Sequence, residues 1–178
     1  RVYDVATNVW HERAGYANGA FTRQRAACQT FFNSSVILGD YQTGEIYMYD
    51  LDMYADGGRT QKWLRSWRAL PANANTLMRT AQHSLQLDCE SGVGLNGNSS
   101  VQGSNPQVML RWSDDGGHTW SNEHWVPMGR IGEYGKRVIW RRLGMTMKLR
   151  DRVYEVSGTD PVPVYVMGAN LLLSNTNA

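Results

Sequence analysis

An octapeptide at residues 113–120 narrows the possible folds of this chain more than any other feature. It reads Ser-Asp-Asp-Gly-Gly-His-Thr-Trp and fits the Asp-box pattern Ser-x-Asp-x-Gly-x-Thr-Trp at every fixed position. The apolar, strand-like residues 108–110 come shortly before it. The combination predicts a β-hairpin of the kind found in β-propeller blades. An ordinary Asp-Gly hairpin turn followed by an unrelated tryptophan is the simpler alternative.

The side chains of the octapeptide explain how such a turn is held. Ser113 and Asp115 are placed to bond backbone N–H groups inside the turn, and Gly117 permits a positive φ. Trp120 is expected to pack beneath the loop, and if its ring is buried, Trp120→Ala costs about 3 to 5 kcal/mol. The box is therefore a structural device and not a catalytic one. Its structural residues are Ser113, Asp115, Gly117, Thr119 and Trp120.

The composition favours strands over helices. The chain has 7 Trp, 9 Tyr and 18 Gly; aromatic residues suit strands, and glycines supply the turns between them. Two-residue alternation recurs along the chain, whereas no segment holds a capped helical period over three turns. We therefore expect an all-β, β-propeller-like fold with Asp-box or kelch-like blades. It is either a partial propeller or a set of blades joined to a small β-sandwich.

Two regions of one domain are predicted. Residues 1–76 form a propeller-like blade region, in which residues 9–54 hold four strand candidates, about the length of one blade. Residues 77–178 hold the Asp-box hairpin and a C-terminal β region. The strands expected after the hairpin are 137–143, 152–157, 162–167 and 171–173. Residues 62–71 fit a strand or a short helix, and residues 96–106 predict an exposed loop.

Bulk properties exclude several classes of protein. No apolar run approaches the roughly 20 residues of a transmembrane helix, so we expect a soluble protein. The formal net charge of +2 is too small to indicate nucleic-acid binding by itself. Cys28 and Cys89 lack metal-ligand spacing and are expected to be free thiols, with one long-range disulfide as the alternative. The chain begins at Arg1 without a leader, which is expected of a processed or trimmed fragment.

The sequence lacks the residue patterns of a sialidase and of a calcium-binding loop. Asp boxes occur in sialidases, but the nearest match to the sialidase Phe/Tyr-Arg-Ile-Pro motif, at residues 21–24, fails at its key positions. Residues 50–57 lack the alternating oxygen ligands of a calcium loop. His118 and His124 are most simply exposed loop side chains. We expect no enzyme, no catalytic residue, no cofactor and no metal.

Other stretches resemble a bacteriophage family. They include Gly-Arg-Ile-Gly-Glu-Tyr at 129–134 and Arg-Val-Ile-Trp-Arg-Arg-Leu-Gly at 137–144, and further stretches at 85–95, 150–156 and 160–162. In this order they resemble the C-terminal part of the packaged-DNA stabilisation proteins, which are tail hubs or head-closure adaptors of short-tailed phages. The resemblance covers about residues 77–170. Family members are longer than this chain, and residues 145–149 depart from them as an insertion.

Basic residues are concentrated in the same region. On a strand, Arg137 and Arg141 face one side and Arg142 faces the other, so the stripe is split unless neighbouring strands realign it. One interpretation is a solvated rim with cross-strand ion pairs. The other is a surface that docks onto an acidic partner or lines a passage for DNA, which the resemblance favours. The candidate contact residues are Lys136, Arg137, Arg141, Arg142, Lys148, Arg150 and Arg152.

The resemblance implies a structural virion protein of a phage tail. Such a protein forms a homo-oligomeric ring below the portal, closes the DNA exit channel, retains packaged DNA and connects later tail proteins. It has no membrane partner and is assembled in the cytoplasm of the bacterial host. The alternative is a carbohydrate-binding or sialidase-like Asp-box propeller, and a kelch-like interaction module is a third hypothesis.

Overall fold

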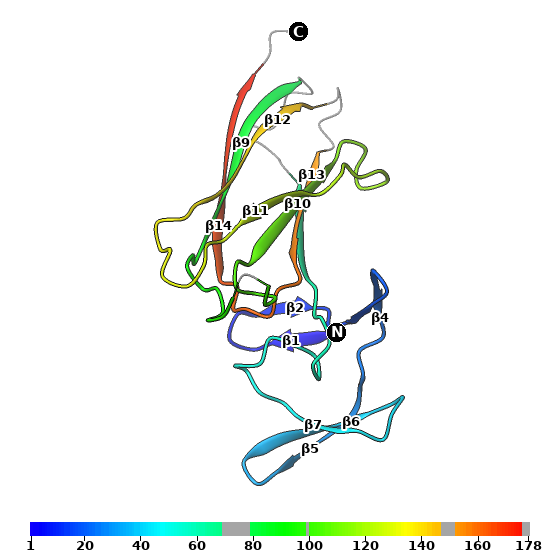
Figure 1. The fold of residues 1–178 in the computed structure, drawn as a ribbon. Coiled ribbons are helices and arrows are strands. Elements are labelled where there is room, and N and C mark those ends of the chain that lie inside the picture. The colour runs from blue at the N-terminus through cyan, green and yellow to red at the C-terminus, as the bar shows by residue number, and fades with distance from the viewer. Residues whose placement is uncertain (69–78, 99, 147–151, 176–178) are drawn as a thin grey trace. The chain divides into compact units, whose positions relative to one another are not determined.

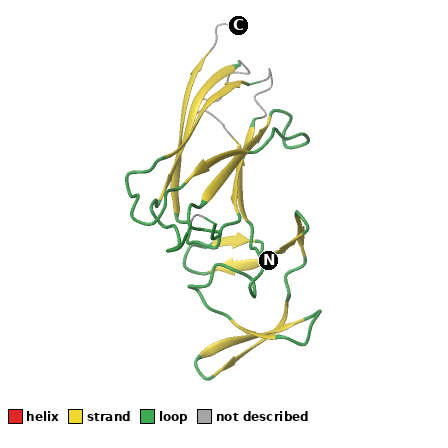
Figure 2. Ribbon diagram, in the orientation of Figure 1, coloured by secondary structure: helices red, strands yellow, loops and turns green. Residues whose placement is uncertain are grey.

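A computed structural model describes residues 1–68, 79–98, 100–146 and 152–175. The described residues contain strands and turns and no helix, so the predicted all-β class is confirmed (Figure 2). The chain divides into two compact units, residues 1–62 and residues 63–178. The strands form five sheets, none of which closes on itself, and the propeller part of the expectation stays a prediction.

The first unit consists of short hairpins and one larger sheet. Two-residue turns with positive φ, Asn18-Gly19 and Asn33-Ser34, connect β3 to β4 and β5 to β6, as tight hairpins require. The sheets are β1-β2, β3-β4 and β5-β6-β7, in place of the single four-stranded blade expected over residues 9–54. The strands are β1 (Val2–Asp4), β2 (Val9–His11), β3 (Gly15–Ala17), β4 (Ala20–Thr22), β5 (Ala26–Phe32), β6 (Ser35–Asp40) and β7 (Ile46–Met48).

Residues 1–62 bury almost nothing. Within this range, all of which is described, Gly15 and the side chain of Asp40 are buried, but no large apolar side chain is. Large apolar side chains lie exposed instead, which is uncommon because soluble proteins rarely leave extended apolar surface in water. The most exposed of them are Val5, Trp10, Phe31, Phe32, Ile46, Met48, Leu51 and Met53. The first unit therefore lacks a core of its own within these residues.

The second unit is built from two antiparallel sheets. One sheet has the order β11-β10-β13-β8 and the other β12-β9-β14 (Figure 1). The strand β8, assigned to the first region by the sequence analysis, hydrogen-bonds to β13 in this unit. The strands are β8 (Trp63–Arg68), β9 (Thr80–Cys89), β10 (Gln107–Ser113), β11 (His124–Pro127), β12 (Val138–Met145), β13 (Val153–Gly158) and β14 (Val166–Asn175).

Side chains from both sheets of the second unit meet in one hydrophobic core. Alternate residues point inward, as expected for strands with one buried face. The Tyr154 hydroxyl on β13 donates a hydrogen bond to the Gln82 side-chain oxygen on β9, which links the two sheets. The buried core residues are Leu85, Leu87, Val108, Leu110, Met128, Val138, Trp140, Leu143, Tyr154 and Val156. This packing of two sheets is a β-sandwich arrangement.

Several predicted elements differ in detail from the structure. The ambiguous residues 62–71 form the strand β8 over their described part, and residues 69–71 lie outside the described residues. Two separate strands were expected over 162–167 and 171–173, but one strand, β14, covers residues 166–175. The proposed insertion at 145–149 begins at the end of β12, and its remaining described residue is Thr146.

Replacing Leu110 by Ala should lower the free energy of unfolding by about 2 to 5 kcal/mol. Leu110 is fully buried in the core between the sheets, so the substitution leaves a cavity. Ile131→Ala is the control, because Ile131 is 59% exposed and its replacement should change stability by less than about 0.5 kcal/mol. Denaturant unfolding measures both. Equal effects of the two substitutions would contradict the position of the core.

Candidate functional site

The turn at residues 113–120 is held by Asp115. Its carboxylate accepts hydrogen bonds from the backbone N–H groups of His118 (3.0 Å) and Thr119 (2.8 Å) and from the Thr119 hydroxyl (2.6 Å). The Ser113 hydroxyl donates to the same carboxylate at 2.6 Å. These hydrogen bonds stabilise the ionised carboxylate, and those from the Ser113 and Thr119 hydroxyls contribute most. The pKa of Asp115 therefore lies well below its ordinary value.

Ser113 and two glycines complete the turn. Ser113 is buried at the end of β10, and its hydroxyl oxygen accepts the backbone N–H of Gly117 at 2.8 Å. Gly116 and Gly117 have φ angles of 73° and 106°, a region that favours glycine. The roles expected of Ser113, Asp115 and Gly117 are thus visible in the hydrogen bonds and backbone angles. Whether the turn is related to Asp boxes of other proteins stays a prediction.

Trp120 lies against Gly117 of the turn, as expected, but it is not fully buried. Its ring is half-buried, and the Arg111 guanidinium carbon lies 4.6 Å from the ring centroid. Arg111 also donates from Nε to a Glu155 carboxylate oxygen at 2.5 Å. Arg111 on β10 therefore contacts both the Trp120 ring, which follows the turn, and the Glu155 carboxylate on β13. With a half-buried ring, the cost of Trp120→Ala falls below the range given for full burial, to about 1 to 2 kcal/mol.

Arg152 is a buried structural residue. Its side chain is 2% exposed, and Nε and one terminal nitrogen donate to both carboxylate oxygens of Asp114 at 2.6 and 2.8 Å. The remaining contacts go to the carbonyl oxygens of Leu143 (2.7 Å) and Met145 (3.1 Å) on β12. Arg152 was predicted to contact a partner or DNA. That assignment is corrected, because the guanidinium is buried and occupied by these four acceptors.

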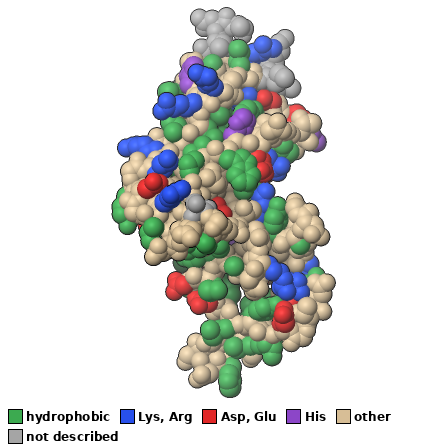
Figure 3. All heavy atoms as spheres, in the orientation of Figure 1, with side chains coloured by type: hydrophobic (Ala, Val, Ile, Leu, Met, Phe, Trp, Pro, Cys, Tyr) green, Lys and Arg blue, Asp and Glu red, His purple; other side chains and the backbone are tan. Residues whose placement is uncertain are grey.

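Other basic residues of the predicted cluster do lie at the surface. Lys136 and Arg137 are exposed in the loop before β12, and Arg141 and Arg142 are exposed on β12 itself. Figure 3 shows Lys and Arg side chains gathered over β12 and this loop. We call Lys136, Arg137, Arg141 and Arg142 the basic surface. Lys148 and Arg150 lie outside the described residues.

A β-bulge aligns the basic surface. Strict alternation would turn Arg142 inward beside the buried Trp140, but the pairing of β12 with β9 shifts its register between Arg141 and Gly144. Arg142 has a φ of 59°, in the left-handed region. Because the bulge adds a residue to the strand, Arg141 and Arg142 are both exposed, and Leu143 takes the inward position. Simple alternation predicted that Arg141 and Arg142 face opposite sides of the strand, whereas the bulge leaves both side chains exposed.

The histidines and cysteines have ordinary structural environments. His124 stacks on Trp112, with ring centroids 4.8 Å apart, whereas His118 is exposed in the turn. Cys28 and Cys89 are free thiols, and burial, with the charge of Asp88, raises the pKa of Cys89 to about 11. Among the described residues, no three His, Cys, Asp or Glu side chains cluster as a metal site would require. No described helix could cross a membrane.

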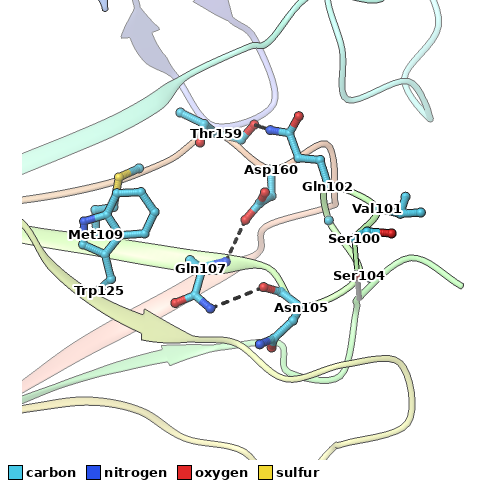
Figure 4. A pocket seen from close by; sticks show the side chains of 11 residues that line it. Ser100, Val101, Gln102, Ser104, Asn105, Gln107, Met109, Trp125, Thr159 and Asp160 are labelled. Carbon is cyan, nitrogen blue, oxygen red and sulfur yellow. Dashed lines mark hydrogen bonds between the residues drawn. The ribbon is translucent and has the colours of Figure 1, made fainter. Parts of the chain in front are cut away.

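A shallow hollow of about 360 Å³ lies at one end of the four-stranded sheet. Figure 4 shows Trp125 and Met109 at one side and polar side chains of two loops at the other. Asp160 accepts the backbone N–H of Gln107 at 2.7 Å, and the Gln102 amide donates to the Thr159 carbonyl at 3.2 Å. These hydrogen bonds connect residues 102–107 to the loop that follows β13. Asp160 is the single ionisable side chain of the lining, so the hollow offers no acid–base pair.

The same arrangement of two sheets appears in the comparison with protein families. Residues 62–173 match the family model described as bacteriophage P22 Gp10, β-sandwich. The chain belongs to this bacteriophage family. The match includes all seven strands of the second unit except the last residues of β14, and it agrees with the sandwich of two sheets. No curated protein matches the chain.

Membership of the P22 Gp10 β-sandwich family supports the general class of protein expected from the sequence, but not the specific hub role. It supports a bacteriophage structural protein that resides in the virion and contacts other virion proteins. It argues against an enzymatic role, and it gives no sign of carbohydrate binding. The turn at 113–120 and the basic surface both lie inside the matched residues. Sequence reasoning missed the structural role of Arg152, because its carboxylate partner Asp114 is distant along the chain.

Arg152→Ala should lower the free energy of unfolding by about 3 to 5 kcal/mol. The substitution leaves Asp114 without its bidentate partner and leaves two β12 carbonyl groups without a donor. Arg141→Ala is the matched control, since Arg141 is exposed, and its effect should stay within about 0.5 kcal/mol. Thermal or denaturant unfolding distinguishes them. A small effect of Arg152→Ala would mean that the guanidinium is solvated and available to partners.

Asp115→Asn should destabilise the protein by an amount that depends on pH. The folded-state pKa of Asp115 is lowered, so its ionised form contributes stability above the unfolded pKa of about 3.9 and loses that contribution as the pH falls towards the folded pKa. The stability difference between wild type and variant should therefore be constant from pH 7 to about 5 and shrink below about pH 4. Denaturant unfolding over this range measures it. A difference that is independent of pH would refute the role of the carboxylate.

Proposed function

We propose that this chain is part of a tail hub or adaptor below the phage portal. In this role, copies of the protein form a homo-oligomeric ring, close the DNA exit channel after packaging, retain the packaged DNA and connect later tail proteins. Assembly takes place in the cytoplasm of the bacterial host. The family membership supports a structural virion protein, and the resemblance in residues 77–170 supports the more specific hub role.

The observation that carries the proposal is the amount of apolar surface that residues 1–62 leave exposed. Phe31, Phe32, Ile46 and Leu51 are each more than 70% exposed. Exposed apolar side chains in such density mark surfaces that are covered in an assembly. A ring multiplies each modest contact between copies, so such surfaces are sufficient for a stable structure. We also propose that residues 1–62 form the propeller-like part of the assembly, with the turn at 113–120 as an Asp box.

The basic surface is proposed as the contact with an acidic partner or with DNA. Its four side chains are exposed, and the bulge at Arg142 brings two arginines to the same side of β12. Arginine and lysine bind phosphate without reading base sequence, which suits a passage through which any DNA sequence moves. A negatively charged rim on the portal or another tail protein would be held by the same groups.

The mass of the assembled protein tests the proposed hub. The protein is measured by mass in solution, alone and after mixing with purified portal rings and tail components. The proposal predicts a defined ring that joins the portal. A monomer that does not bind the portal or any tail component would contradict it.

Arg141→Glu should weaken binding to portal rings or to double-stranded DNA and should make binding less sensitive to salt. Removing one phosphate contact lowers the slope of log affinity against log salt by about 1. Arg65→Glu on β8 is the control, because it makes the same charge change on the other sheet. Binding isotherms at increasing salt measure both variants. If Arg65→Glu and Arg141→Glu weaken binding equally, only the total charge matters and the basic surface is not the contact.

A further inference from the structure

Most strand edges of this chain are blocked against pairing with other strands. The edge of a sheet presents unpaired N–H and C=O groups, and proteins protect it with charged residues, proline, bulges or short strands. The hairpin strands β1 to β4 are three residues long. The strand β11 is short, and β12 carries the bulge at Arg142. The charged or proline residues at the remaining edges are Glu45 beside β7, Arg65 and Arg68 on β8, Pro127 on β11, and Arg141 and Arg142 on β12.

The edge strands β5 and β14 differ from these, because neither carries a charged residue along its length, although each contains a bulge. No charged residue occurs from residue 26 to residue 39, around β5, or from residue 161 to residue 175, through β14. Each strand pairs along one side only, β5 with β6 and β14 with β9, and within the described residues no strand lies on the other side. The backbone groups on these two free edges are therefore available to another strand.

The free edges of β5 and β14 are also matched in length. In β5, Cys28 to Phe32 pair with β6 in unbroken register, beyond a bulge at Ala27. In β14, Gly168 to Leu172 pair with β9 in unbroken register, beyond a bulge at Met167. Each stretch is thus regularly paired over the same number of residues. In β5 all side chains from residue 27 onward are exposed, and in β14 Val166, Met167 and Leu172 are exposed.

We propose that β5 of one copy pairs with β14 of the next copy, and that this strand addition closes the ring. The inference rests on the ring of the proposed function and names the contact that forms it. Addition of a strand to a sheet edge is driven by main-chain hydrogen bonds, and exposed side chains at alternate positions add apolar contact. Neutral edges suit this contact, because no charge on either strand has to be removed from water.

The use of two different edges favours a ring over a two-fold dimer. An interface that joins two different surfaces is heterologous, and repetition of it closes a ring when the rotation allows. The strands β5 and β14 belong to different units of the chain, so each copy offers one edge and receives another. Pairing of β14 with itself would give a two-fold dimer and leave β5 exposed.

Single lysine substitutions in the full-length protein test the contact. Thr30→Lys and Asn170→Lys each place a charge in the middle of one regular stretch, at an exposed polar side chain, so no apolar contact is removed from the fold. Each variant alone should lose the ring and run as a monomer by mass. An equimolar mixture of the two variants should form dimers, because one unmodified β5 and one unmodified β14 remain to pair.

Uncharged substitutions at the same positions are the controls. Thr30→Val and Asn170→Thr keep neutral, strand-compatible side chains and should leave the ring intact. Because the edges are neutral, the ring should also persist when salt is raised from 0.05 to about 0.5 M, unlike a contact through the basic surface. If a lysine variant fails to fold, amide hydrogen exchange of the wild type decides, and residues 28–32 and 168–172 should both become protected on ring formation.

The outcomes separate this inference from the proposed function. A wild-type protein that forms no ring overturns the ring and this contact together. A ring that survives both lysine substitutions, or that forms without protection of these amides, overturns the contact and leaves the ring standing. If Asn170→Lys alone lowers the mass and Thr30→Lys does not, β14 pairs with a partner other than β5, which also overturns the proposal.

Discussion

The buried Arg152 guanidinium connects the parts of the second unit on which its surfaces depend. Arg152 precedes β13 of one sheet and bonds two carbonyl groups of β12 in the other. It also holds Asp114, which begins the turn at 113–120. The carbonyl groups belong to Leu143, which lies inside the bulge that exposes Arg142, and to Met145, which follows the bulge. A charge buried at this point is stable because the guanidinium donates hydrogen bonds to four oxygen atoms and lies over the Trp112 ring. The same contacts fix where the basic surface lies.

Local patterns in the sequence predicted part of the local structure. The roles of Ser113, Asp115 and Gly117 follow from spacing within eight residues, and the structure shows the corresponding hydrogen bonds. Alternation likewise placed Arg137 and Arg141 on one side of a strand, and both are exposed. Such features depend on neighbours along the chain, for which side-chain chemistry and backbone preference suffice.

Features that depend on distant residues were not predictable in this way. The sequence marks Arg152 as one of several arginines in a basic segment, and only the fold brings Asp114 and β12 to it. The bulge places Arg142 in the left-handed region, where glycine or asparagine would be the usual sequence signal. Without that signal at position 142, simple alternation assigned the side chain to the wrong face. In the first unit, the strands of residues 9–54 have the spacing of a blade but pair as separate sheets. Pairing between strands is set by packing, which spacing does not encode.

We propose that this protein works through assembled surfaces and not through a pocket. Electron cryo-microscopy of tails that contain the protein would test this. We expect a ring in which Arg141 and Arg142 face the portal or the DNA channel, the apolar side chains of residues 1–62 are covered, and β5 and β14 of neighbouring copies are paired. Isolated copies, with β12 and the apolar side chains facing solvent, would show that the protein does not work through such surfaces.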